Sequence, residues 1–236
     1  MTVCNHVSLK NKSAQNQLFK LAIKNSFIAD SLAMPVHWFY RVGDILKIFP
    51  DGINQLYPAP KIHPSSIMSL HSKKHGGRAG LSNHEEDVVG RVILKDKTKF
   101  WNQVNVHYHQ GMQAGENTLN AYTVLWLFDS MDNESNPGVY DEVEFLDFYI
   151  KKMTANVPQH PDTYAESYHR GFFANWDSGK EPTQCAAQTH DTASIGGLVR
   201  IGPLVLLSLF KGLDIKKSQT MAESHLKLTH PDKKLS

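Results

Sequence analysis

The chain has 236 residues, of which 41% are hydrophobic and 20% charged, and its formal net charge is +2. These values are ordinary for a globular protein with a sizeable core, and a near-neutral charge gives no reason to expect nucleic acid or a membrane as a partner. There are only two cysteines, and the polar N-terminus has no apolar signal segment. We therefore expect a cytoplasmic protein without a disulfide framework.

The first predicted element is a long helix near the N-terminus. Residues 1–12 are polar and predict a disordered tail, which leaves residues 13–236 as a single domain. Apolar residues recur at intervals of three and four over residues 13–34, and a second apolar stripe predicts that this helix is buried on most sides. Pro35 should end it, because proline disfavours helical geometry in the residue before it. A second short helix is expected over residues 38–49.

Residues 50–112 are rich in Pro, Gly, Ser and His and show no sustained period. They predict a long irregular segment, and such segments are usually functional or disordered. Gly76, Gly77 and Arg78 lie within it, and glycine backbone with a guanidinium can hold a pyrophosphate. A mobile surface loop is the alternative interpretation of the same residues. Residues 88–101 are compatible with either a short helix or a strand.

The second half of the chain predicts a series of helices over residues 116–131, 142–153, 163–176, 192–212 and 215–228. The first of them is apolar on nearly all sides, which places it at the centre of the fold. A capping-box pattern opens the third. No strand alternation and no internal repeat is visible. The sequence therefore predicts an all-α fold, a bundle of several helices.

A few polar residues in these helices are candidates for chemistry. Asp30 lies on the inner part of the first helix, where a carboxylate needs a partner, and it either ties down a loop or belongs to a site. Glu116, Asn117 and Thr118 open the apolar helix with oxygen ligands of the kind that hard cations take, although helix capping favours the same residue types. Arg200 is the only charge in an apolar run and needs a partner of its own.

The order of four segments adds information that no single residue provides. They are Ala29-Asp-Ser-Leu-Ala-Met-Pro-Val-His-Trp38, His107-Tyr-His-Gln-Gly-Met-Gln-Ala-Gly-Glu-Asn-Thr118, residues 162–175, and His190-Asp-Thr-Ala-Ser-Ile-Gly-Gly-Leu-Val-Arg-Ile-Gly-Pro-Leu204. Together they resemble the ADP-ribosylglycohydrolase family in its J1-crystallin-like branch. The resemblance runs through nearly the whole chain from about residue 15.

The resemblance implies an all-α hydrolase of the ADP-ribosylglycohydrolase type that uses Mg²⁺ or Mn²⁺ to cleave an N- or O-glycosidic bond to ADP-ribose. Its substrate would be an ADP-ribosylated protein or small molecule. The implied metal ligands are Glu116, Asn117 and Thr118. The implied catalytic residues are Glu116 and Asp30, and those that position the ligand are Arg200, Gly76 and Gly77.

The chain also departs from the family pattern. His37 stands where the family has Glu, and Gly115-Glu-Asn-Thr118 has one carboxylate where the family has two. The family's second metal motif has no counterpart before Ser236, so the resemblance implies an incomplete domain that lacks the C-terminal helices and exposes apolar surface on the helix over residues 192–212. A catalytically inactive, crystallin-like structural or ADP-ribose-binding relative is the alternative function.

Overall fold

The computed structural model describes residues 12–80, 83–132, 138–189 and 194–232. Its α-helices are α1 Lys12–Ala33, α2 Val42–Ile48, α3 Leu119–Ser130, α4 Glu142–Thr154, α5 Ser167–Asp177, α6 Ile201–Phe210 and α7 Ile215–Lys227. Short 3₁₀ helices lie at Met34–Val36, Met68–Leu70, Thr98–Phe100, Pro182–Gln184 and Ile195–Val199. The described residues form only isolated bridges and no strand. The predicted all-α fold is confirmed, while the ADP-ribosylglycohydrolase type of bundle stays a prediction.

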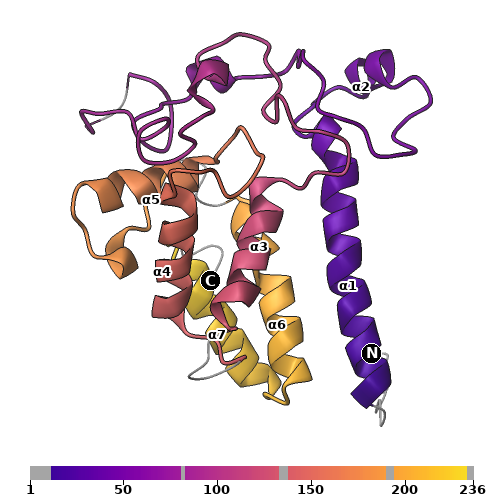
Figure 1. Cartoon of the computed structure of the whole chain (residues 1–236), viewed down its shortest axis with the longest axis vertical. Coiled ribbons are helices and arrows are strands. Elements are labelled where there is room, and N and C mark those ends of the chain that lie inside the picture. Colours follow the sequence, from indigo (N-terminus) through magenta and orange to yellow (C-terminus); the bar gives the residue numbers. More distant parts are fainter. Residues whose placement is uncertain (1–11, 81–82, 133–137, 190–193, 233–236) are drawn as a thin grey trace.

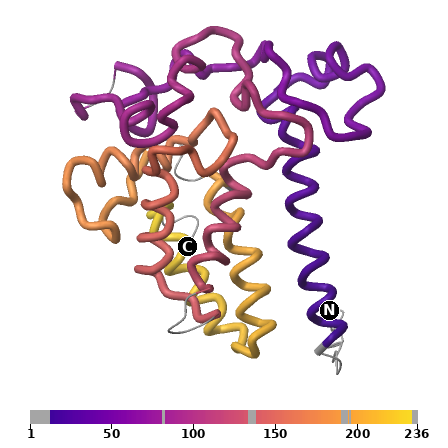
Figure 2. Tube along the Cα trace, in the orientation of Figure 1, coloured from indigo at the N-terminus to yellow at the C-terminus, as the bar shows by residue number. Residues whose placement is uncertain are grey.

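Helices α3 to α7 pack into a bundle, and the irregular segment over residues 50–112 lies across one end of it (Figure 1). The trace in Figure 2 shows α1 running along the side of this bundle, next to α6. Aromatic residues from three helices fill the core between them. They include Trp126 of α3, Tyr149 of α4 and Phe172 of α5, which are at most 2% exposed.

Capping explains where the best-defined helices begin. The Asp141 carboxylate accepts hydrogen bonds from the backbone amides of Val143 and Glu144, and the Asp214 carboxylate accepts one from Lys217. Each bond satisfies an amide that has no partner inside its own helix. Acidic residues in the first turn of α4 and lysines in its last turn also match the helix dipole. Both helices begin where the sequence predicts and end within a residue of the predicted boundary.

Helix α1 is far less buried than its pattern predicts, so the expected burial on most sides is wrong. Leu18 and Leu21 are each 53% exposed. Phe19 packs against Phe128 of α3 and Phe210 of α6, and the last turns of the helix meet the start of α3. The second apolar stripe, which includes Phe19, therefore packs on the bundle, while the face that carries Leu18 and Leu21 is largely exposed. Apolar residues of α6 are also partly exposed, as expected for the helix over residues 192–212.

Several predicted boundaries change for local reasons. Helix α3 starts at Leu119, because the three residues before it form its cap and the turn leading to it. Helix α5 starts at Ser167, because the Thr163 hydroxyl donates to the carbonyl of Gln110 and does not cap a helix. The predicted helix over residues 192–212 is a 3₁₀ turn followed by α6, and its first two residues lie outside the described part. Residues 88–101 form neither an α-helix nor a strand.

A membrane crossing would need a longer apolar helix than any found in the described part of the chain. Helix α6, the most apolar one, has only ten residues.

Candidate functional site

A cavity of about 340 Å³ lies where the end of α1, the start of α3 and the start of α5 meet. Three carboxylates line it, those of Asp30, Asp162 and Glu166, together with the rings of His37 and Trp38. We call this cavity the carboxylate pocket. Its volume is at the lower end of the range for small-molecule sites. Its polar groups come from segments that are far apart in the sequence, so the fold itself brings them together.

Asp30 joins α1 to the start of α3. Its Oδ1 atom accepts a hydrogen bond from the Thr118 hydroxyl at 2.7 Å, and its Oδ2 atom accepts bonds from the Thr118 amide at 2.8 Å and from the Asn117 side chain at 3.0 Å. Asn117 also donates to the carbonyl of Phe27 and to Ser31. The positive end of the α3 helix dipole stabilises a carboxylate at this position. The position of Asp30 is therefore compatible with both predicted roles, a structural one and one in a site, since it ties down α3 and also lines the pocket.

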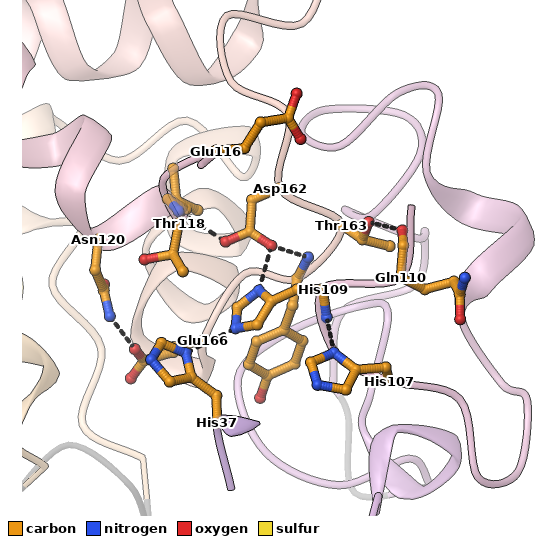
Figure 3. Close-up of polar contacts among 12 residues, drawn as sticks. His37, His107, His109, Gln110, Glu116, Thr118, Asn120, Asp162, Thr163 and Glu166 are labelled. Atoms are coloured by element: carbon orange, nitrogen blue, oxygen red, sulfur yellow. Dashed lines mark hydrogen bonds and ion pairs between the residues drawn. The ribbon is translucent and has the colours of Figure 1, made fainter. Parts of the chain in front are cut away.

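Glu116 does not join this cluster. Its carboxylate accepts a hydrogen bond from the backbone amide of Gln113 at 2.7 Å, and the residue is not part of the pocket lining. Figure 3 shows the Glu116 side chain turned away from Asp162 and Glu166. The three consecutive residues proposed as metal ligands therefore diverge: Thr118 lines the pocket, Asn117 contacts Asp30, and Glu116 stabilises its own turn.

The residues at the pocket do not by themselves fit a divalent-ion site. Among the described residues, no three His, Cys, Asp or Glu side chains come close enough to hold a metal ion. At the start of α3 the carboxylates already accept hydrogen bonds, that of Asp30 from Thr118 and Asn117 and that of Asp162 from the Leu119 amide. A cation next to the positive end of a helix needs several carboxylates. Binding of Mg²⁺ or Mn²⁺ therefore stays a prediction from the resemblance.

Asp162 anchors a hydrogen-bonded chain that leads back to the pocket surface. Its Oδ1 atom lies 2.7 Å from Nδ1 of His109, and its Oδ2 atom accepts the amide of Leu119 at 2.7 Å. Nε2 of His109 lies 2.9 Å from Nδ1 of His37 (Figure 3). Burial alone would raise the pKa of Asp162, but the His109 ring and the Leu119 amide outweigh it and hold that pKa at about 2. Asp162 is therefore ionised at neutral pH.

The pKa of the Glu166 carboxylate is shifted in the opposite direction from that of Asp162. Its Oε1 atom accepts a hydrogen bond from the Asn120 side chain at 2.7 Å, and it lies against Gly196, where a methyl group would come within 2.5 Å of Oε2. Burial, reinforced by the charge of Asp162, raises the pKa of Glu166 above its ordinary value. Only glycine at position 196 leaves room for this carboxylate. Besides Asp30, the pocket thus contains one ionised carboxylate, Asp162, and one that holds its proton more tightly than usual, Glu166.

Arg200 is buried away from the pocket, in the core. It donates to Nε2 of His225 at 2.9 Å, to the Thr229 hydroxyl at 2.6 Å and to the Thr123 hydroxyl at 3.4 Å, and its guanidinium lies over the ring of Phe145. Burial, and then the charge of Arg200, lowers the pKa of His225, so this partner is neutral. The guanidinium therefore ties α6 to α3 and to the end of α7, and it is not placed to hold a ligand in the pocket.

Gly76 and Gly77 border a different cavity, of about 790 Å³. Arg170 of α5, which is fully buried, donates to the carbonyl of Gly77 at 3.3 Å, to that of His75 at 3.3 Å and to that of Ala165 at 2.6 Å. The loop is thus fixed to α5 through its carbonyl groups. The structure does not bring these two glycines to the carboxylate pocket.

Of the residues at this site, the sequence predicts Asp30 and Thr118, and it assigns no role to His37, His109 or Asp162. Asp162 precedes α5 in an irregular segment. The paired histidines at positions 107 and 109 were the one signal in the sequence for this part of the pocket. No periodicity connects them to residue 37 or to residue 162.

Comparison with known proteins adds no assignment, because no family model, no curated protein and no solved structure matches the chain.

Proposed function

We propose that the chain is a hydrolase that cleaves a glycosidic bond of an ADP-ribosyl group in the carboxylate pocket. The observation that carries the proposal is the convergence of Asp30, Asp162 and Glu166 from three separate segments on one cavity. Glycoside hydrolysis needs a group that protonates the leaving atom and groups that activate water or stabilise positive charge at the sugar carbon, and carboxyl side chains supply both.

The environments of the carboxylates support a division of these tasks. Glu166 is half-buried in the pocket wall with a raised pKa, and we assign it the protonation of the leaving group. Asp30 is also half-buried and lines the pocket, where its charge stabilises a sugar carbon with oxocarbenium character. Asp162, only 1% exposed, acts from behind the surface through the residues that it orients.

The substrate class comes from the resemblance in the sequence and agrees with the size of the pocket. A cavity of about 340 Å³ accepts a ribose and the atoms on either side of its C1 carbon, and the rest of an ADP-ribosyl group would extend outside. Trp38 and Tyr164 contribute aromatic rings to the wall, with their centroids 5.4 Å apart. Such rings offer an apolar surface to one face of a sugar. The substrate is an ADP-ribosylated protein or small molecule.

Two measurements on the purified chain test the proposal. ADP-ribose at millimolar concentration should raise the melting temperature, because a ligand that binds only the folded state stabilises it. The measurement is made with and without Mg²⁺, so that a dependence on the ion appears as a larger shift. The chain should also release free ADP-ribose from an ADP-ribosylated protein, detected by chromatography. No melting shift and no release under either condition would refute the proposal.

A pair of substitutions identifies the reacting group. Glu166→Gln removes the proton donor and should lower the rate of release by about 100-fold, while the melting shift caused by ADP-ribose is retained. Glu223→Gln, on the exposed surface of α7, is the matched control and should leave both quantities unchanged. An equal loss of activity in the two variants would contradict the role of Glu166.

An inactive, crystallin-like structural or ADP-ribose-binding relative is the second candidate function. One observation favours it: Glu116 is occupied in its own turn, and both oxygens of Asp30 already accept hydrogen bonds from the start of α3. In that case ADP-ribose either raises the melting temperature without turnover, or has no effect on a fold that is stable without metal. Detectable release of ADP-ribose rules this candidate out.

A further inference from the structure

We infer that Asp162 and His109 form a relay that fixes the ring of His37 with an unprotonated Nε2 atom facing the carboxylate pocket, where it takes the proton of the attacking water. This inference rests on the proposed function and deepens it, since it names the base of the reaction. It makes His37 a catalytic residue and His109 and Asp162 positioning residues.

Hydrogen-bond directions determine the tautomers, beginning at the carboxylate. An ionised Asp162 only accepts, so the nitrogen 2.7 Å from it, Nδ1 of His109, carries a hydrogen. The proposal gives the His109 ring this single hydrogen, which makes its Nε2 atom an acceptor for a hydrogen from Nδ1 of His37 across 2.9 Å. His37 has thereby placed its only ring hydrogen on Nδ1. Its Nε2 atom keeps a free lone pair.

The free nitrogen of His37 is also accessible. No described residue forms a hydrogen bond with Nε2 of His37, and this atom is not among the polar atoms that are sealed from water without a partner. The residue is half-buried and lines the pocket. A water molecule in the pocket can therefore donate to it, which is the first requirement for a general base.

Neighbouring contacts hold the His109 ring and the backbone of both histidines in place. The indole of Trp38 stacks on His109 with centroids 5.5 Å apart and planes at 27°. The backbone amide of His109 donates to Nδ1 of His107 at 3.1 Å, and the backbone carbonyl of His37 lies 2.8 Å from Nε2 of His63. A base that is already oriented loses little rotational freedom when the substrate binds, which is how positioning lowers a barrier.

The proton balance of the step is as follows. Water gives a proton to Nε2 of His37 while its oxygen forms a bond to the C1 carbon of the ribose. The bond from C1 to the leaving nitrogen or oxygen breaks, and the carboxyl proton of Glu166 moves to that leaving atom. Burial lowers the pKa of His37 to about 3, so the ring is neutral before the reaction, and the negative charge of Asp162 offsets part of the cost of forming the imidazolium. Return of the proton from His37 to Glu166 through solvent restores both groups, and the net reaction consumes one water.

The tautomers can be measured without any substrate. In a chain labelled with ¹⁵N histidine, long-range ¹H–¹⁵N spectra at pH 7 should show His37 and His109 as neutral rings with the hydrogen on Nδ1. In Asp162→Asn the side-chain NH₂ group can replace only one oxygen, and both oxygens now accept backbone amides, Oδ2 that of Leu119 at 2.7 Å and Oδ1 that of Tyr164 at 3.1 Å. Keeping the shorter of these two bonds places the NH₂ group at Oδ1, where it faces His109. The hydrogen of His109 then moves to Nε2, and His37 is forced to carry its own hydrogen on Nε2. Asp177→Asn, at a surface ion pair with Arg91, is the matched control and should leave both tautomers unchanged.

Kinetic measurements complete the test. Asp162→Asn and His37→Ala should each lower kcat by about 100-fold or more with little change in KM, and free imidazole should restore part of the activity of His37→Ala only. A hydrogen on Nε2 of His37 in the unsubstituted chain, or a charged His109 ring, overturns the relay whatever the activity. If the chain shows the expected tautomers but releases no ADP-ribose, the relay is supported and the hydrolase proposal is overturned. Failure of the relay and failure of the proposed function therefore give different results.

Discussion

Replacement of Asp30 by alanine removes three hydrogen bonds that attach α1 to the start of α3. The partners are the amide and hydroxyl of Thr118 and the side chain of Asn117, at 2.7 to 3.0 Å. A hydrogen bond to a charged acceptor contributes roughly 1.5–3 kcal/mol when it is buried, and the loss of a helix cap costs about 1 kcal/mol. Because Asp30 is only half-buried and water can replace part of what is lost, we expect the free energy of unfolding to fall by about 2–3 kcal/mol.

Urea denaturation followed by circular dichroism measures this loss. With a slope of about 3 kcal/mol per molar urea, the transition midpoint should fall by roughly 1 M. Asp44→Ala is the matched control, because that partly exposed carboxylate is paired with Lys47 of the same short helix, and its midpoint should fall far less than that of Asp30→Ala. A shift in Asp30→Ala no larger than that of the control would show that the carboxylate does not hold α1 in place.

Three further predictions follow from the geometry of the core and the pocket. Gly196→Ala should change the free energy of unfolding by less than about 1 kcal/mol, since the Glu166 carboxylate can swing away, yet it should reduce turnover. Gly197→Ala places a methyl group 2.7 Å from a buried imidazole ring and should lower the free energy of unfolding by about 1–3 kcal/mol in the same urea assay. A larger loss of stability in Gly196→Ala than in Gly197→Ala would contradict this packing. The pKa of Asp162 is lowered to about 2, so its ionised form adds about 2 kcal/mol to the free energy of unfolding above pH 4, and this contribution is lost as the pH falls towards 2. The free energies of unfolding of the unsubstituted chain and of Asp162→Asn, measured against pH, should therefore converge at low pH. Burial raises the pKa of the Cys185 thiol to about 11, so in a variant that lacks the other cysteine a thiol reagent should react only after unfolding; rapid reaction of the native chain would refute its burial.

The helices could be predicted from the sequence where local signals agree. Helices α4 and α7 have apolar faces at helical spacing and an aspartate cap at the start, so pattern and chemistry give the same boundary. The start of α5 was misplaced because the hydroxyl of Thr163 has a tertiary partner, the carbonyl of Gln110. The degree of burial of α1 was misjudged because an apolar stripe shows only that a helix can be packed on that side, and it does not supply the neighbour.

The candidate site could be predicted only in part. Asp30 and Thr118 were expected together, and the structure brings them within hydrogen-bond distance. The contacts among His37, His109 and Asp162 were not foreseen, because these residues lie in irregular segments whose path depends on the whole fold. Glu116 was expected to face the same point as Thr118, but residues two apart near a helix start do not share a face.

The narrow attachment of α1 has a consequence for ligand binding. The helix is held by the aromatic contacts of Phe19 and by the bonds of Asp30, while much of its remaining surface meets solvent. Such an element can detach as one cooperative unit at a lower free energy than global unfolding, and amide exchange along it should be faster than along α3. Detachment takes Asp30 out of the pocket wall. The measured affinity for any molecule that touches Asp30 is therefore the intrinsic affinity multiplied by the fraction of chains in which α1 is docked.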